Sequence, residues 1–191
     1  AAVKHTHALW QTSRGWMVFR DPRRFGGLAT LPDDASLRAR WAALGPDGLS
    51  VTGQELAAAL CRSARAIKPA LLDQAAVAGV GNIYADESLH LAGIAPTRKC
   101  LRIKASEFQR LADAIRGVLA RAVAAGGSTL KDYVDADGRR GSYVASHAVY
   151  GRGGEPCVTC AAPLEQRVIG QRTTVWCRIC QPRTAAKRPS S

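Results

Sequence analysis

The hydrophobic and polar positions of the first 31 residues follow a pattern that is typical of β-strands. The segment HALWQTSRGWMVFRD contains two short apolar runs, and apolar positions alternate in the second. The letters SRG between the runs are typical of a tight turn. We therefore expect residues 1–31 to be β structure. Turn-forming PDD and GPDG then predict a linker over residues 32–50.

Start and stop signals predict two short helices after the linker. The sequence T-x-x-E from Thr52 to Glu55 is a capping box, which predicts a helix that begins there and carries Leu56 on its apolar face. Pro69 can occupy the first position of a second helix. The glycines of AGVGN then end that helix.

A third helix is predicted over IYADESLHLAG. Asn82 can cap this helix, Asp86 and Glu87 lie early in it, and Gly93 ends it. A fourth and longest helix is expected to begin at a second capping box formed by Ser106 and Gln109. The apolar residues on one face of that helix are Phe108, Leu111, Ile115, Val118, Leu119 and Ala122.

Composition adds the expectation of a polyanionic partner. The chain of 191 residues has 27 Lys and Arg against 15 Asp and Glu, a net charge of +12. Arginines recur beside glycines and aromatics in RDPRRFGG, DGRRGSY, VYGRGG and GQRTTVW. An excess of this size favours nucleic acid, because neutralising phosphates releases condensed counterions. A membrane-surface role would favour a basic amphipathic helix, whereas these arginines lie mostly in turns.

No targeting or membrane signal is visible in the sequence. Its apolar runs are far shorter than the about 20 residues that cross a bilayer, and the opening AAVKHTHALW has no signal-peptide pattern. We therefore expect a cytoplasmic protein with no membrane partner.

Four of the six cysteines form two tight pairs, C-x2-C-x16-C-x2-C. This spacing predicts a tetrahedral zinc site in which four thiolates fill the coordination shell, so the metal is structural. Two disulfides are the alternative, but they need an oxidising compartment. Between the pairs, RVIG and RTTVW predict two strands with GQ in the turn. The ligands are Cys157, Cys160, Cys177 and Cys180, whereas Cys61 and Cys100 are expected to be partly buried thiols.

Four strings, in this order, resemble the formamidopyrimidine-DNA glycosylase family: RDPRRFGG, LLDQAAVAGVGNIYADE, GGSTLKDYVDADGRRGSY and VYGRGGEPCVTC with GQRTTVWCRICQ. They are similar to the family's DNA-inserting loop, helix–two-turn–helix, lesion-capping loop and zinc finger. The resemblance covers nearly the whole chain. It implies base-excision repair of damaged double-stranded DNA: removal of oxidised purines (8-oxoguanine, formamidopyrimidines) and β,δ-elimination at the abasic site. It also implies a bacterial, nucleoid-associated protein, which we expect to be a monomer.

The resemblance assigns DNA contacts to several residues. Arg23 and Arg24 precede Phe25, which can wedge into the base stack. Gly81 lies in the turn between helices, where glycine lets the backbone approach phosphate. Asn82 and Lys68 are implied to hold phosphates beside the lesion.

Arg172, in GQRTT, matches the family arginine that grips phosphates at the lesion and is assigned as the acid for δ-elimination. Because a guanidinium does not lose its proton, we expect phosphate binding to be its main role. His5 matches a family DNA contact, although a surface histidine is almost as good an interpretation. Lys131 is expected either to help hold the lesion phosphate or to be a solvated lysine.

The family's catalytic start is missing from this chain. Family members begin with a Pro-Glu-Leu-Pro-type sequence whose proline amine forms the Schiff base, whereas this chain opens near KHTH. We therefore expect a fragment that lacks the N-terminal nucleophile and is inactive alone; a natural truncation kept for DNA binding is the alternative. A non-catalytic zinc-ribbon module and an endonuclease VIII-like enzyme for oxidised pyrimidines are the rival functions.

The predicted fold is an α+β multidomain chain. It comprises the remnant of an N-terminal catalytic β-sandwich, a linker, a helix–two-turn–helix DNA-binding domain with a lesion-capping loop, a zinc-finger β-hairpin and a disordered tail. The corresponding residues are 1–31, 32–50, 51–145, 146–183 and 184–191.

Overall fold

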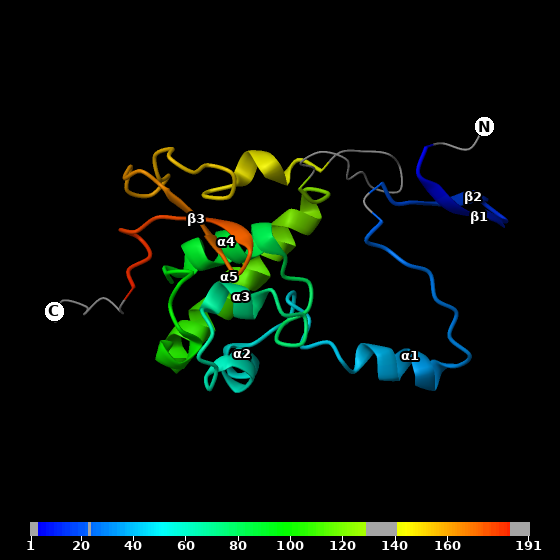
Figure 1. Ribbon diagram of the computed structural model, residues 1–191, viewed down its shortest axis with the longest axis horizontal. Helices are drawn as coiled ribbons and strands as arrows, with labels where there is room; N and C mark the ends of the chain where they lie inside the picture. The colour runs from blue at the N-terminus through cyan, green and yellow to red at the C-terminus, as the bar shows by residue number, and fades with distance from the viewer. Residues whose placement is uncertain (1–3, 23, 129–140, 184–191) are drawn as a thin grey trace. The chain divides into compact units, whose positions relative to one another are not determined.

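The computed structural model describes residues 4–22, 24–128 and 141–183 (Figure 1). It divides the chain into two compact units, Ala1–Trp41 and Ala42–Ser191, here called the N-terminal and C-terminal units. Expectations for Arg23, for Lys131 with the rest of the capping loop, and for the tail at 184–191 lie outside the described residues.

The N-terminal unit contains the predicted β-hairpin. Strand β1 (Thr6–Thr12) pairs antiparallel with β2 (Gly15–Arg20), which confirms two strands around the SRG turn. Successive side chains of a strand point to opposite faces of the sheet. Trp16 and Met17 are 65% and 55% exposed, so within this unit the hairpin leaves apolar surface uncovered on both faces.

A short helix, α1 (Asp34–Trp41), lies inside the segment that we interpreted as a linker. The letters PDD predict a turn, but Asp33 acts as a helix cap: its Oδ1 accepts a hydrogen bond from the Ser36 N–H at 2.7 Å. None of the α1 residues is buried. Local capping therefore specifies this helix. The sequence gives no sign of it, because the helix has no apolar face.

The C-terminal unit begins with the four predicted helices. They are α2 (Gly53–Leu60), α3 (Ile67–Leu71), α4 (Asn82–Ala92) and α5 (Ala105–Ala124), with a single 3₁₀ turn at Cys100–Arg102. The capping box at Thr52 and Glu55 is confirmed, with both reciprocal hydrogen bonds present. Gly93 ends α4 in the left-handed conformation, with φ of 67°, also as predicted.

Three predicted helix starts are wrong by one or two residues. Pro69 is the third residue of α3, which is still within the first turn, where its missing N–H has no intrahelical partner. Asn82 is the first residue of α4 rather than its cap. The capping carboxylate of α5 is Glu107, not Gln109, and its Oε2 accepts from the Lys104 N–H at 2.9 Å.

The core of the C-terminal unit forms around α5, which packs against α2 and α4 (Figure 1). All six residues of the predicted apolar face of α5 are buried. The same core encloses a bidentate ion pair, in which Arg98 donates to both carboxylate oxygens of Glu107 at 2.7 and 2.6 Å. A buried pair of this kind tolerates no loss of one partner, since the other charge would stay unpaired.

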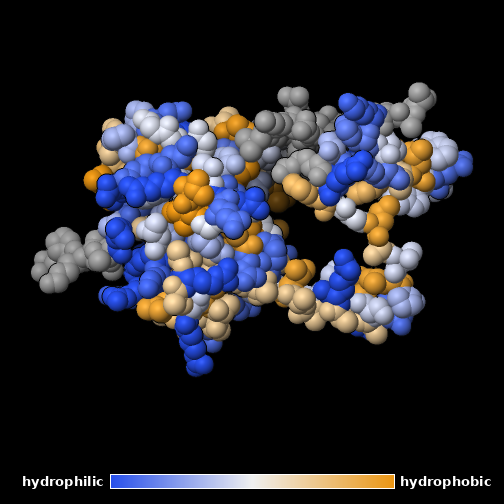
Figure 2. All heavy atoms as spheres, viewed as in Figure 1, coloured by the Kyte–Doolittle hydropathy of each residue, from blue (hydrophilic) through white to orange (hydrophobic). Residues whose placement is uncertain are grey.

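The predicted cysteine hairpin follows a 3₁₀ turn at Tyr143–Ser146. Strands β3 (Glu165–Ile169) and β4 (Arg172–Trp176) pair antiparallel, and Gly170 and Gln171 make a type I′ turn with φ of 56° and 63°. Both strands and the GQ turn are therefore confirmed. Figure 2 shows mainly hydrophilic atoms over the face of the C-terminal unit in view.

Two smaller findings concern the remaining cysteines and the helices. Cys61 is exposed and Cys100 is fully buried, so the expectation that both are partly buried is wrong. None of the helices in the described ranges is long and apolar enough to cross a bilayer.

The Arg98–Glu107 pair predicts a pH-dependent loss of stability. Arg98 holds the pKa of the Glu107 carboxyl below its ordinary value of 4.5, so its stabilising contribution is present above that pH and is lost as the pH falls through the folded-state pKa. Glu107→Gln should lower the free energy of unfolding by about 3–5 kcal/mol at neutral pH. In urea titrations, the difference in free energy of unfolding between the variant and wild type should narrow below about pH 4.

The matched control is Asp113→Asn, which removes a solvent-exposed ion pair of the same helix. It should cost about 1 kcal/mol or less. Equal losses for the two variants, or a gap that is constant with pH, would contradict the role given to Glu107.

Candidate nucleic-acid interface

Helix α4 presents a polar edge to the cysteine hairpin. Asn82, Asp86 and His90 follow at intervals of four residues, which places them on one side of the helix. Asn82 Nδ2 donates to the Thr173 carbonyl at 3.1 Å, and Asp86 Oδ2 accepts from the Val175 N–H at 3.2 Å. His90 Nε2 lies 3.5 Å from Sγ of Cys157, in the segment that precedes the hairpin. One edge of α4 therefore fixes the hairpin at several points along its length.

The innermost contact of this edge is a buried ion pair between Lys68 and Asp86. Lys68 Nζ lies 2.7 Å from Asp86 Oδ1, and it also donates to the Thr173 carbonyl at 2.9 Å and to Thr174 Oγ1 at 2.8 Å. An ammonium has three donors, so all are used. Both side chains are 1% exposed or less.

Burial shifts the pKa of both partners. It lowers the pKa of Lys68, against the attraction of Asp86. It raises the pKa of Asp86 to about 6, against the opposing effects of Lys68 and the Val175 N–H. Lys68 was expected to hold a phosphate; in this arrangement its ammonium is closed to solvent and is bound by Asp86 of α4 and by Thr173 and Thr174 of the hairpin.

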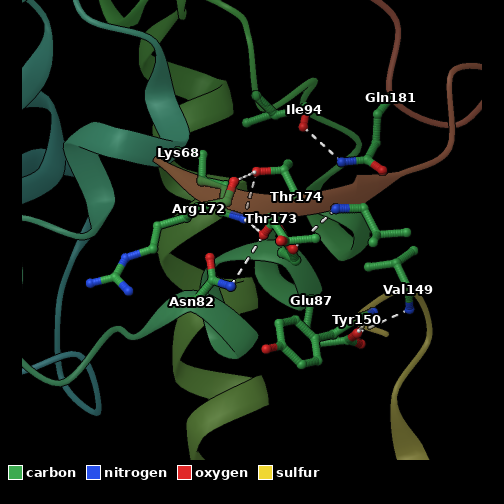
Figure 3. A network of polar contacts seen from close by, with 12 residues as sticks. Lys68, Asn82, Glu87, Ile94, Val149, Tyr150, Arg172, Thr173, Thr174 and Gln181 are labelled. Atoms are coloured by element: carbon green, nitrogen blue, oxygen red, sulfur yellow. Dashed lines mark hydrogen bonds and ion pairs between the residues drawn. The ribbon is translucent and has the colours of Figure 1, made fainter. Parts of the chain in front are cut away.

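Arg172 lies between two anchored positions of the hairpin. On one side, a Cβ added to Gly170 would come within 2.8 Å of Pro69 Cγ, so the turn packs tightly on α3. On the other side, the Thr173 carbonyl accepts from both Lys68 and Asn82. The Arg172 side chain itself is exposed, and in Figure 3 its guanidinium extends away from the buried contacts.

The turn before α4 leaves the start of that helix open. Gly79 has φ of 87°, which requires glycine, but Gly81 has φ of −100°, which any residue can adopt. A Cβ built on Gly81 meets nothing within 4 Å. No side chain caps the helix at this end. Within the described residues, then, nothing requires glycine at 81, and the first N–H groups of α4 are not capped.

Asn82 has a further unused group at the same place. Its Oδ1 is buried and has no hydrogen-bond partner among the described residues, although its Nδ2 is bound to the hairpin. The side chain was expected to contact phosphate. In the structure it joins α4 to the strand that carries Arg172, and the phosphate contact stays a prediction.

In the N-terminal unit, Asp21 closes the RDPRRFGG loop. Its Oδ2 accepts from the Gly26 N–H at 2.6 Å, and its carbonyl accepts from the N–H of Arg24, whose φ is 55°. Phe25 is 80% exposed, which argues against a core role. His5 is exposed, and its carbonyl accepts from the Asp21 N–H at 3.1 Å.

Glu87 is a site residue that sequence reasoning missed. It was interpreted only as an acidic residue early in a helix, but its carboxylate accepts from three consecutive N–H groups, those of Ala148, Val149 and Tyr150, at 2.8, 3.0 and 2.8 Å. It thereby holds the segment that leads into the cysteine cluster. The available signal in the sequence was VYGR, an irregular segment whose backbone N–H groups need hydrogen-bond partners.

His147 is a second residue that sequence reasoning missed. Its ring lies between those of Tyr143 and Tyr150, with centroids 5.7 and 5.6 Å away. Ser128 Oγ lies 3.2 Å from His147 Nε2. This contact joins the part of the chain before residue 129 to the part after residue 140. Burial lowers the pKa of His147, and the Glu87 carboxylate opposes that shift.

The four paired cysteines come together as predicted. Their sulfur atoms all lie within 4.8 Å of one another, with 3.9 Å between Cys157 and Cys180 and 3.4 Å between Cys160 and Cys177. The set can hold one metal ion. Buried Gln181 supports it, because its Oε1 accepts from the Cys177 N–H and its Nε2 donates to a carbonyl of the helical core.

Comparison with known proteins gives a consistent result. The model of the formamidopyrimidine-DNA glycosylase H2TH domain matches residues 44–134. Two curated relatives named formamidopyrimidine-DNA glycosylase, from Solibacter usitatus and Xanthomonas campestris pv. campestris, are 43% and 47% identical over 180 residues. The matches cover 94% and 93% of this chain, and 67% and 66% of the relatives. The chain thus spans about two thirds of the length of these relatives.

Solved structures agree with the sequence relatives. The MutM (Fpg) protein of Thermus thermophilus superposes with a TM-score of 0.84 at 42% identity, covering 95% of this chain and 70% of that one. The Lactococcus lactis Fpg in complex with DNA containing an abasic site gives a TM-score of 0.86 at 32% identity, covering 95% and 68%.

The Lys68–Asp86 pair predicts that the hairpin depends on both partners. Lys68→Met leaves an unpaired carboxylate in a buried position and should lower the free energy of unfolding by about 3–5 kcal/mol near neutral pH. Because Lys68 lowers the pKa of Asp86, its removal places that pKa above the value of about 6 in wild type, so the loss should shrink as the pH falls toward about 6. Urea unfolding as a function of pH measures both effects.

The control is Arg65→Met, which removes the exposed ion pair with Asp73. We expect it to change stability by about 1 kcal/mol or less at every pH. A Lys68→Met variant as stable as this control would show that the buried pair does not hold the hairpin.

Proposed function

This chain belongs to the formamidopyrimidine-DNA glycosylase family, and we propose that it forms the DNA-gripping part of a base-excision repair enzyme. The proposed reaction is removal of oxidised purines from duplex DNA, followed by β,δ-elimination at the abasic site. The observation that carries the proposal is the joint placement of Arg172 and the uncapped start of α4, which Asn82 and the Thr173 carbonyl hold together at 3.1 Å. The L. lactis relative is solved with DNA that contains an abasic site.

Phosphate is the chemical group that this placement fits. An exposed guanidinium offers up to five N–H donors, and the N-terminus of a helix attracts anions through its free N–H groups and dipole. Gly81 lets a DNA backbone approach these N–H groups closely, since it adds no Cβ between them and solvent. A phosphate held from both sides is fixed in position, which is what flipping a nucleotide out of the stack requires.

The charge of Arg172 favours phosphate binding over proton transfer. A guanidinium keeps its proton in proteins, so Arg172 supports β,δ-elimination by holding phosphate charge rather than by acting as the acid. In the N-terminal unit, exposed Phe25 can act as the wedge that fills the gap left by the flipped base, with Arg24 beside it for the backbone.

We infer that zinc is the metal held by the four cysteines. At a Zn–S distance of about 2.3 Å, the edges of a regular zinc tetrathiolate are about 3.8 Å, close to the 3.9 Å and 3.4 Å of the two measured pairs. Four thiolates leave no open position, so a zinc ion here would hold the hairpin rather than carry out chemistry.

Zinc removal should therefore release Arg172 from its position. Stripping the metal with a chelator should melt residues 150–181, because metal binding and folding are coupled in such small modules. DNA affinity should fall with it, and both changes should reverse when zinc is restored. Circular dichroism and gel-shift titrations measure the two effects, and unchanged affinity after complete removal of the metal would count against the proposal.

The Gly81 result gives a test that separates binding from folding. Gly81→Ala should leave the melting temperature unchanged, because its Cβ meets nothing within 4 Å among the described residues. Affinity for a duplex with an abasic-site analogue should fall, by about tenfold if one phosphate contact worth about 1.4 kcal/mol is lost. Gly117→Ala in α5, whose Cβ meets only the end of a flexible arginine, is the matched control and should bind normally. Normal binding by Gly81→Ala would remove the helix start from the interface.

The function itself is tested by gel shift and borohydride trapping on one duplex. Among the described lysines, burial lowers the pKa of Lys68, but this amine is closed behind the hairpin and cannot reach a sugar carbon. We therefore propose that the chain shifts a duplex carrying an abasic site or 8-oxoguanine but forms no trapped cross-link. A cross-link would show that an amine of this chain is the nucleophile, and absence of any shift would refute DNA binding.

A further inference from the structure

A cavity of about 290 Å³ lies at the open end of the cysteine hairpin. In the register of the hairpin, Glu165 pairs with Trp176 at this end, whereas Ile169 pairs with Arg172 at the turn. The two ends are four residues apart, or about 13 Å at about 3.3 Å per residue. The cavity is thus separate from the phosphate site proposed above. Its walls are formed by Thr97, Glu165, Arg167, Trp176, Arg178, Gln181, Pro182 and Arg183.

Positive charge dominates this arginine cavity. Among the described residues that line it, three arginines, Arg167, Arg178 and Arg183, face a single carboxylate, that of Glu165. Glu165 Oε1 lies 2.8 Å from Arg178 Nη1, and its Oε2 lies 3.9 Å from Arg167 Nη2. One negative charge cannot neutralise three positive ones, so the cavity keeps a net positive charge of two. The side chains of Arg167 and Arg178 are 67% and 64% exposed, so an incoming anion can reach their free donors.

The floor of the cavity is rigid. Trp176 is 6% exposed and Gln181 is 1% exposed. Gln181 is held at both ends, by the Cys177 N–H and by the Ile94 carbonyl, each at 2.9 Å. The mouth therefore carries exposed arginine side chains over a buried base. Glu165 further restrains the Arg178 fork, which reduces the conformational entropy that binding would cost.

The chemistry of the arginine cavity matches a phosphate group. Guanidinium forks bind phosphate or carboxylate through pairs of parallel hydrogen bonds. The Glu165 carboxylate already neutralises one of the three positive charges, so two remain. Two positive charges suit a dianion better than a second monoanion. A cavity of this volume is at the small end of ligand sites, which fits a phosphate or diphosphate better than a whole nucleotide.

We propose that the arginine cavity is a second anion site, which binds a phosphate group at the end of the hairpin remote from Arg172. This inference rests on the proposed function for one of its two sources, a backbone phosphate of the bound DNA beyond the lesion. The other source is a free phosphoanion, which would bind without DNA. Both use the same contacts, so the cavity can be tested directly.

The test compares one double variant with a charge-matched control. Arg178→Gln with Arg183→Gln removes two arginines of the cavity, whereas Arg62→Gln with Arg110→Gln removes two exposed arginines elsewhere in the same unit. Circular dichroism and metal content confirm that both proteins fold. Each is titrated with pyrophosphate by calorimetry. Each is also titrated with a short abasic duplex and with a longer one, at several salt concentrations.

The expected result takes one of two forms, according to the source of the phosphate. For a free anion, the cavity variant loses pyrophosphate binding at least about tenfold, a loss of about 1.4 kcal/mol. For DNA, the slope of log affinity against log salt concentration becomes shallower by about 1 for each lost phosphate contact. This change is expected with the longer duplex and not with the short one. The idea is overturned if the cavity variant equals the control in both titrations. If wild type fails to bind DNA, the proposed function fails, while the pyrophosphate titration still decides this inference.

Discussion

The buried ion pair between Lys68 and Asp86 fixes the cysteine hairpin, and with it Arg172, on α4. A buried pair is stable only if its remaining donors and acceptors are satisfied. Here the hairpin satisfies them, through the Thr173 carbonyl, the Thr174 hydroxyl and the Val175 N–H. The hairpin therefore cannot shift along α4 without leaving a buried charge unpaired, and this constraint sets where Arg172 projects.

Helix α4 has three roles, and the residues that serve them alternate along its sequence. One face, with Ala85 and Leu89, is buried in the helical core. A polar edge docks the hairpin, and Glu87 beside it holds the segment from Ala148 to Tyr150. The uncapped start of the helix stays open to an anion. One rigid element thus relates the helix start, the hairpin and the metal-binding cysteines, as a precise phosphate clamp requires.

The sequence predicted the elements well wherever a local signal specified them. The T-x-x-E box, the apolar face of α5, the GQ turn and the cysteine spacing each carry their own geometry. The predictions failed where the deciding contact comes from far along the chain. Asn82 was interpreted as a helix cap, but its partner, Thr173, is 91 residues away. The burial of Lys68 was not foreseen either, because Thr174, which it contacts, is 106 residues away. Helix α1 was not predicted for another reason: it has a cap but no buried face.

The measurement that tests this account most directly is a scan of neutral phosphates. A set of abasic duplexes, each with one methylphosphonate in place of a phosphate, is titrated with wild type, Gly81→Ala and Arg172→Gln. The account predicts that wild type loses affinity at one or two adjacent positions, and that both variants are insensitive at those same positions. Sensitive positions that differ between the two variants would show that Arg172 and the start of α4 do not hold a common phosphate.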